Sequence, residues 1–81
     1  MGPMEFDTNR PGKDYTDFDL PADDPQLCLH ACAGEANCKA WTYVKPNASQ
    51  GFAQRCWLKG AILPKASDTC CASGVKTAGP P

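Results

Sequence analysis

The chain has 81 residues, enough for one small domain, and contains six cysteines, eight prolines and seven glycines. Eight basic and nine acidic residues give a formal net charge of −1, and the lack of a basic run argues against nucleic acid as a ligand. No apolar stretch approaches the roughly 20 residues that span a bilayer, which argues against membrane insertion.

The cysteine content is high for a chain whose mean hydropathy is −0.43. A domain of this size buries a small share of its unfolded surface, so its apolar core contributes little stability. An even number of cysteines at this density indicates disulfide bonds, which form and persist in oxidising compartments. We therefore expect a secreted or periplasmic domain, and a monomeric one.

The N-terminal sequence MGPMEF lacks the apolar segment of an export signal. We interpret residues 1–4 as a remnant of cloning and expect the natural protein to be longer, with its signal upstream. The expected domain covers residues 5–76, and residues 77–81 (TAGPP) are expected to form a flexible tail or linker.

The first predicted element is extended chain at residues 5–20, interrupted by a turn at Pro11-Gly12. A type II turn would use the positive φ that Gly12 tolerates. After the turn, Thr16, Phe18 and Leu20 alternate with polar residues, which is typical of a strand with one apolar face.

The clearest helix signal follows. Asp24 suits the N-cap and Pro25 the first helical position, where a missing N–H costs nothing. The helix is expected to end at Gly34. Within it, Cys28 and Cys32 are four residues apart and therefore project from one face, toward a surface packed beneath the helix.

Two strands are expected to form that surface. Residues 38–44 (CKAWTYV) and 53–59 (AQRCWLK) both alternate small and bulky side chains. Cys38 and Cys56 lie on the less bulky faces, so we expect the helix to pack on those faces. Residues 61–69 are expected to be irregular, and residues 72–76 (ASGVK) to form a short closing strand.

The spacing favours two cysteine pairs. Cys32 and Cys38 are joined by a short loop, which leaves Cys28 to reach Cys56 on the neighbouring strand. Loop-closure entropy predicts that these bonds stabilise the domain by roughly 2.4 and 3.6 kcal/mol respectively, and strain in the bonds would lower these upper values.

These cysteines and their flanks resemble the PAN/apple domain family. The matching features are the helical pair Cys28 and Cys32, CKAWTYV at 38–44 and CWLKG at 56–60. The resemblance extends through the lead-in DTNRPGKDYTDFDL and the closing CCASGV, about residues 6–76, and these flanks are most similar to a bacterial subgroup. It implies a small disulfide-stapled α+β fold, with a curved antiparallel sheet and one α-helix packed on it.

The resemblance also implies the bonds Cys28–Cys56 and Cys32–Cys38, the pairs that spacing favours. Many apple domains join their ends through a third disulfide, whereas here no cysteine precedes Cys28. The adjacent Cys70 and Cys71 remain, and a vicinal disulfide that clamps a turn is one expectation for them. The alternatives are free thiols, a bond to another chain, or a redox switch.

The aromatic residues suggest a binding surface. If the helix covers the small face, Trp41, Tyr43 and Trp57 form one patch on the opposite face. Aromatic rings edged by cations suit a sugar ring or a protein loop. The alternative, which the small size of the domain favours, is a second small core that buries Trp41 and Trp57. The expected binding residues are Lys39, Trp41, Tyr43, Arg55, Trp57 and Lys59.

The sequence argues against a metal, a cofactor or catalysis. Cys28 and Cys32 fit the outer edge of zinc-ligand spacing, but His30 between them projects elsewhere on the helix. His30 is the single histidine, and no nucleophile or carboxylate is spaced to orient it. The acidic residues before the helix lack a calcium-loop pattern and are expected to be solvated or capping groups: Asp17, Asp19, Asp23 and Asp24.

These observations predict a non-catalytic extracellular or periplasmic recognition module, part of a larger exported protein, which binds a protein or a carbohydrate. The alternatives are a free-standing disulfide-rich inhibitor or toxin-like ligand, and a structural spacer without a ligand. The triplet Asn47-Ala48-Ser49 is a glycosylation sequon in an expected surface loop, unused if the source is bacterial.

Overall fold

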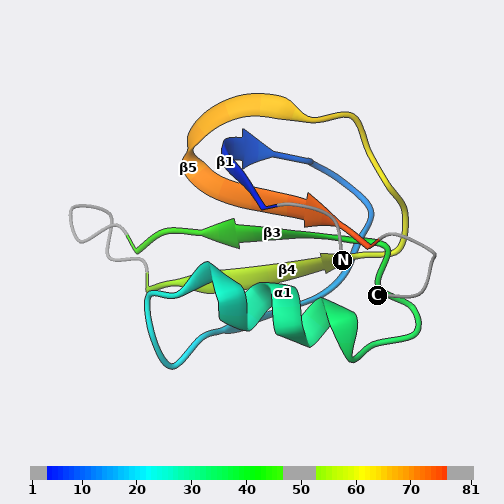
Figure 1. Cartoon of the computed structure of the whole chain (residues 1–81), viewed down its shortest axis with the longest axis horizontal. Helices are drawn as coiled ribbons and strands as arrows, with labels where there is room; N and C mark the ends of the chain where they lie inside the picture. Colours follow the sequence, from blue (N-terminus) through cyan, green and yellow to red (C-terminus); the bar gives the residue numbers. More distant parts are fainter. Residues whose placement is uncertain (1–3, 47–52, 77–81) are drawn as a thin grey trace.

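A computed structural model describes residues 4–46 and 53–76 of the chain. These residues form one antiparallel sheet with one helix on it, which confirms the predicted α+β class (Figure 1). The sheet order is β1-β5-β3-β4-β2. The elements are β1 (Glu5–Asn9), β2 (Asp14–Asp19), α1 (Pro25–Ala33), β3 (Ala40–Val44), β4 (Arg55–Lys59) and β5 (Ala66–Val75).

The helix begins and ends at the predicted residues. The Asp24 carboxylate accepts the Gln26 amide at 3.0 Å, and Pro25 opens the helix, where no amide hydrogen is needed. Gly34 caps the other end with a φ of −84°, so the cap does not use the left-handed conformation open to glycine. Within the described ranges, no helix has the length and apolarity to cross a membrane.

The orientation of β3 differs from the prediction. Trp41 pairs with Leu58 and Tyr43 with Cys56, and directly paired residues share a face of the sheet. Since Cys56 is bonded to Cys28 of α1, both aromatics lie under the helix, where they are 0% and 2% exposed.

The predicted orientation is wrong because Cys38 lies outside the strand. Its amide donates to Glu35 O at 3.2 Å in the turn before Ala40, so strand alternation does not govern its side chain. On β4, by contrast, the cysteine face does carry the helix, as predicted.

The largest difference from the sequence prediction is β5. It covers Ala66–Val75, where we expected an irregular connection followed by a short strand. Phe6 pairs with Ala72 and Thr8 with Ser67, so the four residues 68–71 of β5 stand opposite Asp7 alone. Such a bulge bends a strand. β5 accordingly curls over and carries β1 with it (Figure 1).

The core lies between α1 and the sheet. It contains Trp41, Tyr43 and Leu58 together with Leu20, Ala72 and the cysteines of α1 and its surroundings. Gly74 pairs with Trp41 and leaves room for the indole ring. The turn before β2 uses Gly12 at a φ of +103°, the positive value expected from the sequence.

Candidate binding site

The sheet face opposite α1 is built from the residues that alternate with the core. Thr42 pairs with Trp57 on one side and with Ser73 on the other, and Val44 pairs with Cys71. The Thr42 and Ser73 hydroxyls are hydrogen-bonded at 2.9 Å, and Ser73 donates to the Thr8 carbonyl at 2.8 Å. These bonds tie β3 to β5 and β5 to β1, so this part of the face is a fixed surface.

A pocket of about 280 Å³ opens on this face. Its floor comes from β3, β4 and the bend of β5, and its wall from the end of β1, the turn that follows it and the start of β2. The floor residues are Thr42, Val44, Trp57, Cys70 and Cys71. The wall residues are Asn9, Pro11, Gly12 and Asp14, and Lys59 of β4 joins them.

Trp57 is the one aromatic residue that lines this pocket, and it is half-buried. The Arg55 guanidinium lies 5.7 Å from the centre of its ring, in a cation–π contact. Arg55 in turn donates to Asp17 at 2.7 Å and to Asp19 at 2.6 Å, and these bonds raise the pKa of its guanidinium. Arg55 does not line the pocket, so it holds the indole from outside it.

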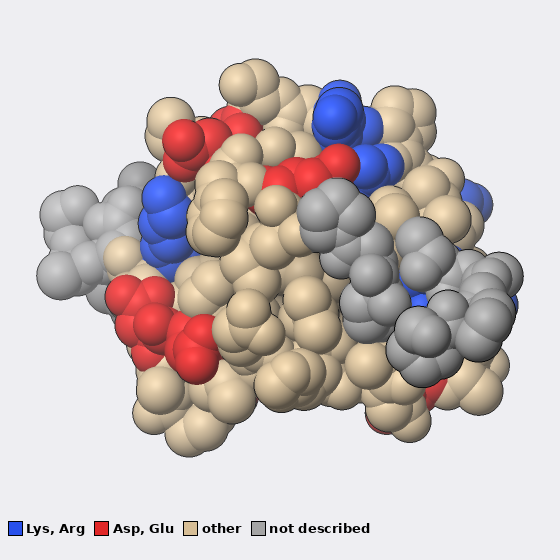
Figure 2. Space-filling view, viewed as in Figure 1, with Lys and Arg blue, Asp and Glu red and all other residues tan. Residues whose placement is uncertain are grey.

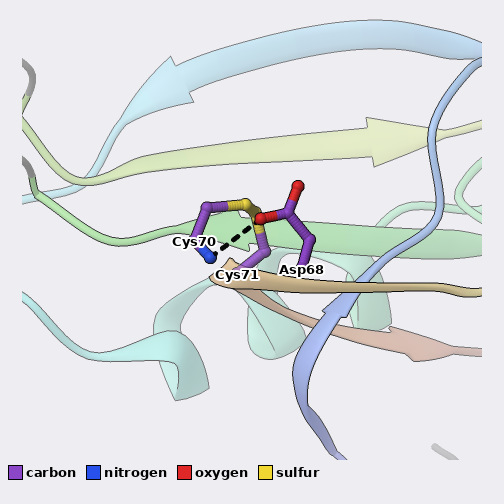
Figure 3. A group of neighbouring side chains, drawn as sticks. All are labelled: Asp68, Cys70 and Cys71. Atoms are coloured by element: carbon purple, nitrogen blue, oxygen red, sulfur yellow. Dashed lines mark hydrogen bonds between the residues drawn. A yellow bond between two sulfur atoms is a disulfide. The ribbon is translucent and has the colours of Figure 1, made fainter.

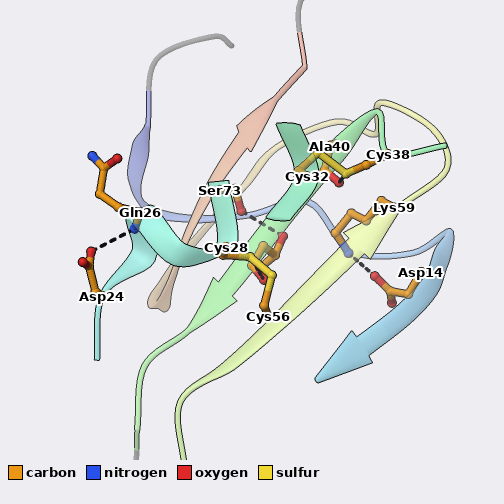
Figure 4. The surroundings of a disulfide bond; sticks show 11 residues. Asp14, Asp24, Gln26, Cys28, Cys32, Cys38, Ala40, Cys56, Lys59 and Ser73 are labelled. Carbon is orange, nitrogen blue, oxygen red and sulfur yellow. Dashed lines mark hydrogen bonds and ion pairs between the residues drawn. A yellow bond between two sulfur atoms is a disulfide. The ribbon is translucent and has the colours of Figure 1, made fainter. Parts of the chain in front are cut away.

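The charge in the pocket wall is internally balanced. Lys59 has a side chain only 3% exposed, and its ammonium group forms an ion pair with the Asp14 carboxylate (Figure 4). The Gly12 carbonyl lies 3.4 Å from the same Lys59 nitrogen. Lys59 and Asp14 are the charged residues of the pocket lining, and they neutralise each other.

The bend of β5 carries the bonded pair Cys70–Cys71, which Figure 3 shows beside Asp68. One Asp68 oxygen accepts the Cys70 amide at 3.1 Å, a local bond typical of a turn. The two sulfurs and one oxygen of the Asp68 carboxylate lie within 4.8 Å of one another, close enough to bind a single metal ion. Cysteine binds a metal as a thiolate, and the disulfide between Cys70 and Cys71 leaves no thiolate at either residue. The arrangement therefore suits a turn clamp that presents sulfur to the pocket.

The other two disulfides attach α1 to the rest of the domain. Cys28 of α1 is bonded to Cys56 of β4, and Cys32 to Cys38 in the turn before β3 (Figure 4). Their Cα–Cα distances are 5.3 and 5.2 Å. All four cysteines are 0% exposed. These are the pairs that the spacing and the family resemblance favour.

The predicted binding residues do not share one face. Trp41 and Tyr43 belong to the core beneath α1, and burial and a hydrogen bond to Asp23 raise the pKa of the Tyr43 phenol. Lys39 is exposed in the turn before β3, and Arg55 stands beside the pocket. Of the six predicted binding residues, Trp57 and Lys59 are the two that line the pocket. The second-core alternative expected both tryptophans to be buried away from the helix; Trp41 is buried, but in the core beneath α1, and Trp57 stays half-buried.

Sequence reasoning missed Thr42, Val44 and the wall residue Asn9 as lining residues. Thr42 and Val44 alternate with Trp41 and Tyr43, so the correct orientation of β3 would have identified both. Asn9 is brought to the pocket by the pairing of β1 with β5, and no local pattern indicates that pairing.

The acidic residues near the helix each have a partner. Asp17 and Asp19 bind Arg55, Asp23 accepts the Tyr43 hydroxyl, and Asp24 caps α1. His30 is exposed on α1, as expected for a surface histidine. The sequon at Asn47 lies outside the described residues.

The outer surface of α1 is uncharged, because the helix contains no acidic or basic side chain apart from His30. Figure 2 shows the side of the molecule on which the helix lies, with charged side chains in the upper and left parts of the view and a mostly uncharged lower central surface. The charge pattern of this side therefore gives no sign of a strongly acidic or basic partner.

A sequence model of the PAN domain family matches residues 8–59. No curated protein matches the chain. The matched range contains β2, α1, β3 and β4, with the four cysteines that attach the helix, and it includes part of β1. β5 lies beyond it, although it pairs with both β1 and β3.

Proposed function

The chain belongs to the PAN domain family, and from this premise we propose that it is a non-catalytic recognition module that binds its ligand in the pocket opposite α1. PAN domains are in general interaction modules that bind proteins or carbohydrates. The observation that carries the proposal is the pocket of about 280 Å³ with a half-buried tryptophan in its floor. A concave site with apolar surface and a few polar groups is the usual form of a ligand site.

The proposal assigns ligand contact to Trp57, with the ion-paired Lys59 as part of the pocket wall and Arg55 in a positioning role. A half-buried tryptophan offers a large contact area to a ligand at a low cost in side-chain entropy. Lys39 is exposed outside the pocket, and Trp41 and Tyr43 support the site from the core.

We propose that the module covers residues 5–76 and belongs to a larger exported protein. Support for the C-terminal boundary comes from β5, which lies between β1 and β3 and ends at Val75. Support for an oxidising compartment comes from three disulfides in 81 residues, since cytosolic thiols are kept reduced.

Binding is tested on glycan arrays and by pull-down from a secreted fraction, with the oxidised domain as the probe. Trp57→Ala removes the aromatic floor, and Phe6→Ala is the matched control, because Phe6 is an exposed aromatic that does not line the pocket. We expect a partner that binds the native domain and Phe6→Ala but not Trp57→Ala. Equal binding by all three proteins would refute the pocket as the site, and silence of the native domain on both platforms would favour a spacer.

A further inference from the structure

We propose that the ligand of this pocket is a single neutral pyranose ring, held between the Trp57 indole and the partly exposed Cys70 of the vicinal disulfide Cys70–Cys71. This inference rests on the proposed function and specifies its ligand class. Its physical basis is the shape of the pocket, the chemistry of its floor and the balance of its charges.

The size of the pocket favours a small ligand. Sites for drug-sized molecules measure about 300–1,000 Å³. The pocket on the sheet measures about 280 Å³, at the lower end of that range. One sugar ring fits such a volume, whereas a helix or a folded loop needs an extended groove. Further sugar units of an oligosaccharide would extend beyond the pocket into solvent.

The floor has two surfaces that suit the apolar side of a pyranose. A pyranose ring presents C–H groups on its faces, and these carry a small positive charge that is attracted to the negative face of an indole. The Cys70 side chain is partly exposed, and a soft, polarisable sulfur suits dispersion contacts with C–H groups, whereas Cys71 is 1% exposed. Cys71 pairs with the half-buried Val44, which places the vicinal disulfide beside the apolar side chain of β3.

The fold holds this floor in a fixed shape. Residues 68–71 form the bulge opposite Asp7, and the Asp68 carboxylate fixes the Cys70 amide at 3.1 Å. On the other side of the pocket, Arg55 lies over the indole and is anchored by two carboxylates. A rigid floor lowers the ordering cost of binding a weakly interacting ligand.

The wall supplies polar atoms without net charge. Asn9 lines the pocket, and an asparagine amide can both donate and accept hydrogen bonds, which is the pattern that sugar hydroxyls require. Asp14 and Lys59 satisfy each other as an ion pair, so an anionic sugar would find no unpaired cation among the lining residues. Desolvating a charged group without a partner is costly, and this favours a neutral sugar over a uronic or sialic acid.

The test is a titration of the oxidised, ¹⁵N-labelled domain with neutral methyl pyranosides (glucoside, galactoside and mannoside) and with methyl glucuronide. The chain has two tryptophans, and they serve as internal reporters. Trp57 lines the pocket, whereas Trp41 is 0% exposed beneath the helix. We expect at least one neutral sugar to shift the Trp57 indole N–H and the Cys70 and Cys71 amides in a saturable way. The resonance of the Trp41 indole N–H should not shift.

Two changes then test the floor. Trp57→Ala should weaken binding of that sugar about tenfold or more, the loss expected for a central aromatic contact, and Phe6→Ala should leave it unchanged. Mild reduction opens Cys70–Cys71 first, because Cys70 is partly exposed and the other disulfides are buried. A mass gain of about 2 Da verifies that one bond has opened, and we expect weaker binding at an unchanged Trp41 signal.

Three outcomes would overturn the inference. They are shifts confined to residues on the α1 side, preferential binding of the glucuronide, and the absence of any saturable shift with the neutral sugars. The third outcome leaves the proposed function intact if a partner found by pull-down still depends on Trp57, and the ligand is then a protein. If ligand binding did not depend on Trp57 in any assay, the proposed function itself would be refuted.

Discussion

Gly74 of β5 lies directly opposite Trp41 of β3, and the indole ring occupies the space that any larger residue would need. A Cβ added to Gly74 would lie 2.7 Å from Trp41 Nε1 and 2.8 Å from Cε2 and Cζ2 of the same ring. The ring is 0% exposed and packed on all sides, so it has no room to retreat. The close contact of these two residues lets β5 pass beside the largest side chain of the core.

We predict that Gly74→Ala lowers the free energy of unfolding by about 1–3 kcal/mol, the usual cost of overpacking a core. Gly60→Ala is the matched control, because its new Cβ would meet Tyr15 at 4.0 Å, an ordinary contact. Urea unfolding followed by tryptophan fluorescence measures both variants. A Gly74→Ala protein as stable as the control would show that Trp41 can move.

The second prediction concerns the buried ion pair in the pocket wall. Asp14→Asn leaves the Lys59 ammonium nearly buried without its counter-ion, and we expect a loss of up to about 3 kcal/mol, moderated by the 31% exposure of Asp14. The double variant Asp14→Asn with Lys59→Met should recover part of this loss, because the unpaired charge is gone. Urea unfolding of the two single variants and the double variant gives the coupling energy.

Lys45→Met is the control for that cycle. Lys45 pairs with Asp7 at 3.5 Å, but both side chains are at least half exposed, so its loss should cost about 0–1 kcal/mol. A cost for Asp14→Asn as small as for Lys45→Met would contradict the assignment of Lys59 as a buried cation.

The third prediction compares the two disulfides that hold α1. Cys28 and Cys56 are separated by 28 positions, whereas Cys32 and Cys38 are separated by six. Loop-closure entropy then predicts that Cys28→Ala/Cys56→Ala loses about 1 kcal/mol more stability than Cys32→Ala/Cys38→Ala. Thermal unfolding of both double variants tests the order, and peptide mapping without reduction tests the pairing. A fragment joining Cys28 to any cysteine other than Cys56 would contradict it.

The fourth prediction concerns acid. The Arg10 side chain donates to both Glu5 oxygens, at 3.0 and 2.9 Å, and this hydrogen bonding holds the pKa of the Glu5 carboxyl below its ordinary value. A lowered pKa means that the folded state favours the ionised carboxylate. The stabilisation is therefore complete above the ordinary pKa of 4.5 and is lost as the pH falls through and below it.

Glu5→Gln should lower stability at pH 7 and flatten the decline between about pH 5 and pH 2. Glu35→Gln serves as the control, since Glu35 is exposed and outside this contact. Thermal unfolding measured across this range distinguishes the two. An acid profile unchanged by Glu5→Gln would show that Arg10 contributes little to Glu5 in solution.

The sequence determined those features of this protein that depend on neighbours along the chain. The helix could be predicted to the residue, because Asp24, Pro25 and Gly34 act on amides and carbonyls within one turn of themselves. The same local geometry placed Cys28 and Cys32 on the face that meets the sheet, where both are fully buried. The alternating patterns of residues 38–44 and 53–59 indicated strands beneath the helix, and the resemblance to PAN/apple domains implied the α+β class.

Only the tertiary structure decided which face of each strand meets the helix and how far β5 extends. A strand segment has two faces, and the choice depends on its register with other strands, so a shift of one residue exchanges them. In β3 the register places Trp41 beneath the helix, and Thr42 on the pocket side with Trp57. β5 is a strand because β1 and β3 supply hydrogen-bonding partners from distant parts of the chain, and the pocket exists because β5 bends at Cys70–Cys71.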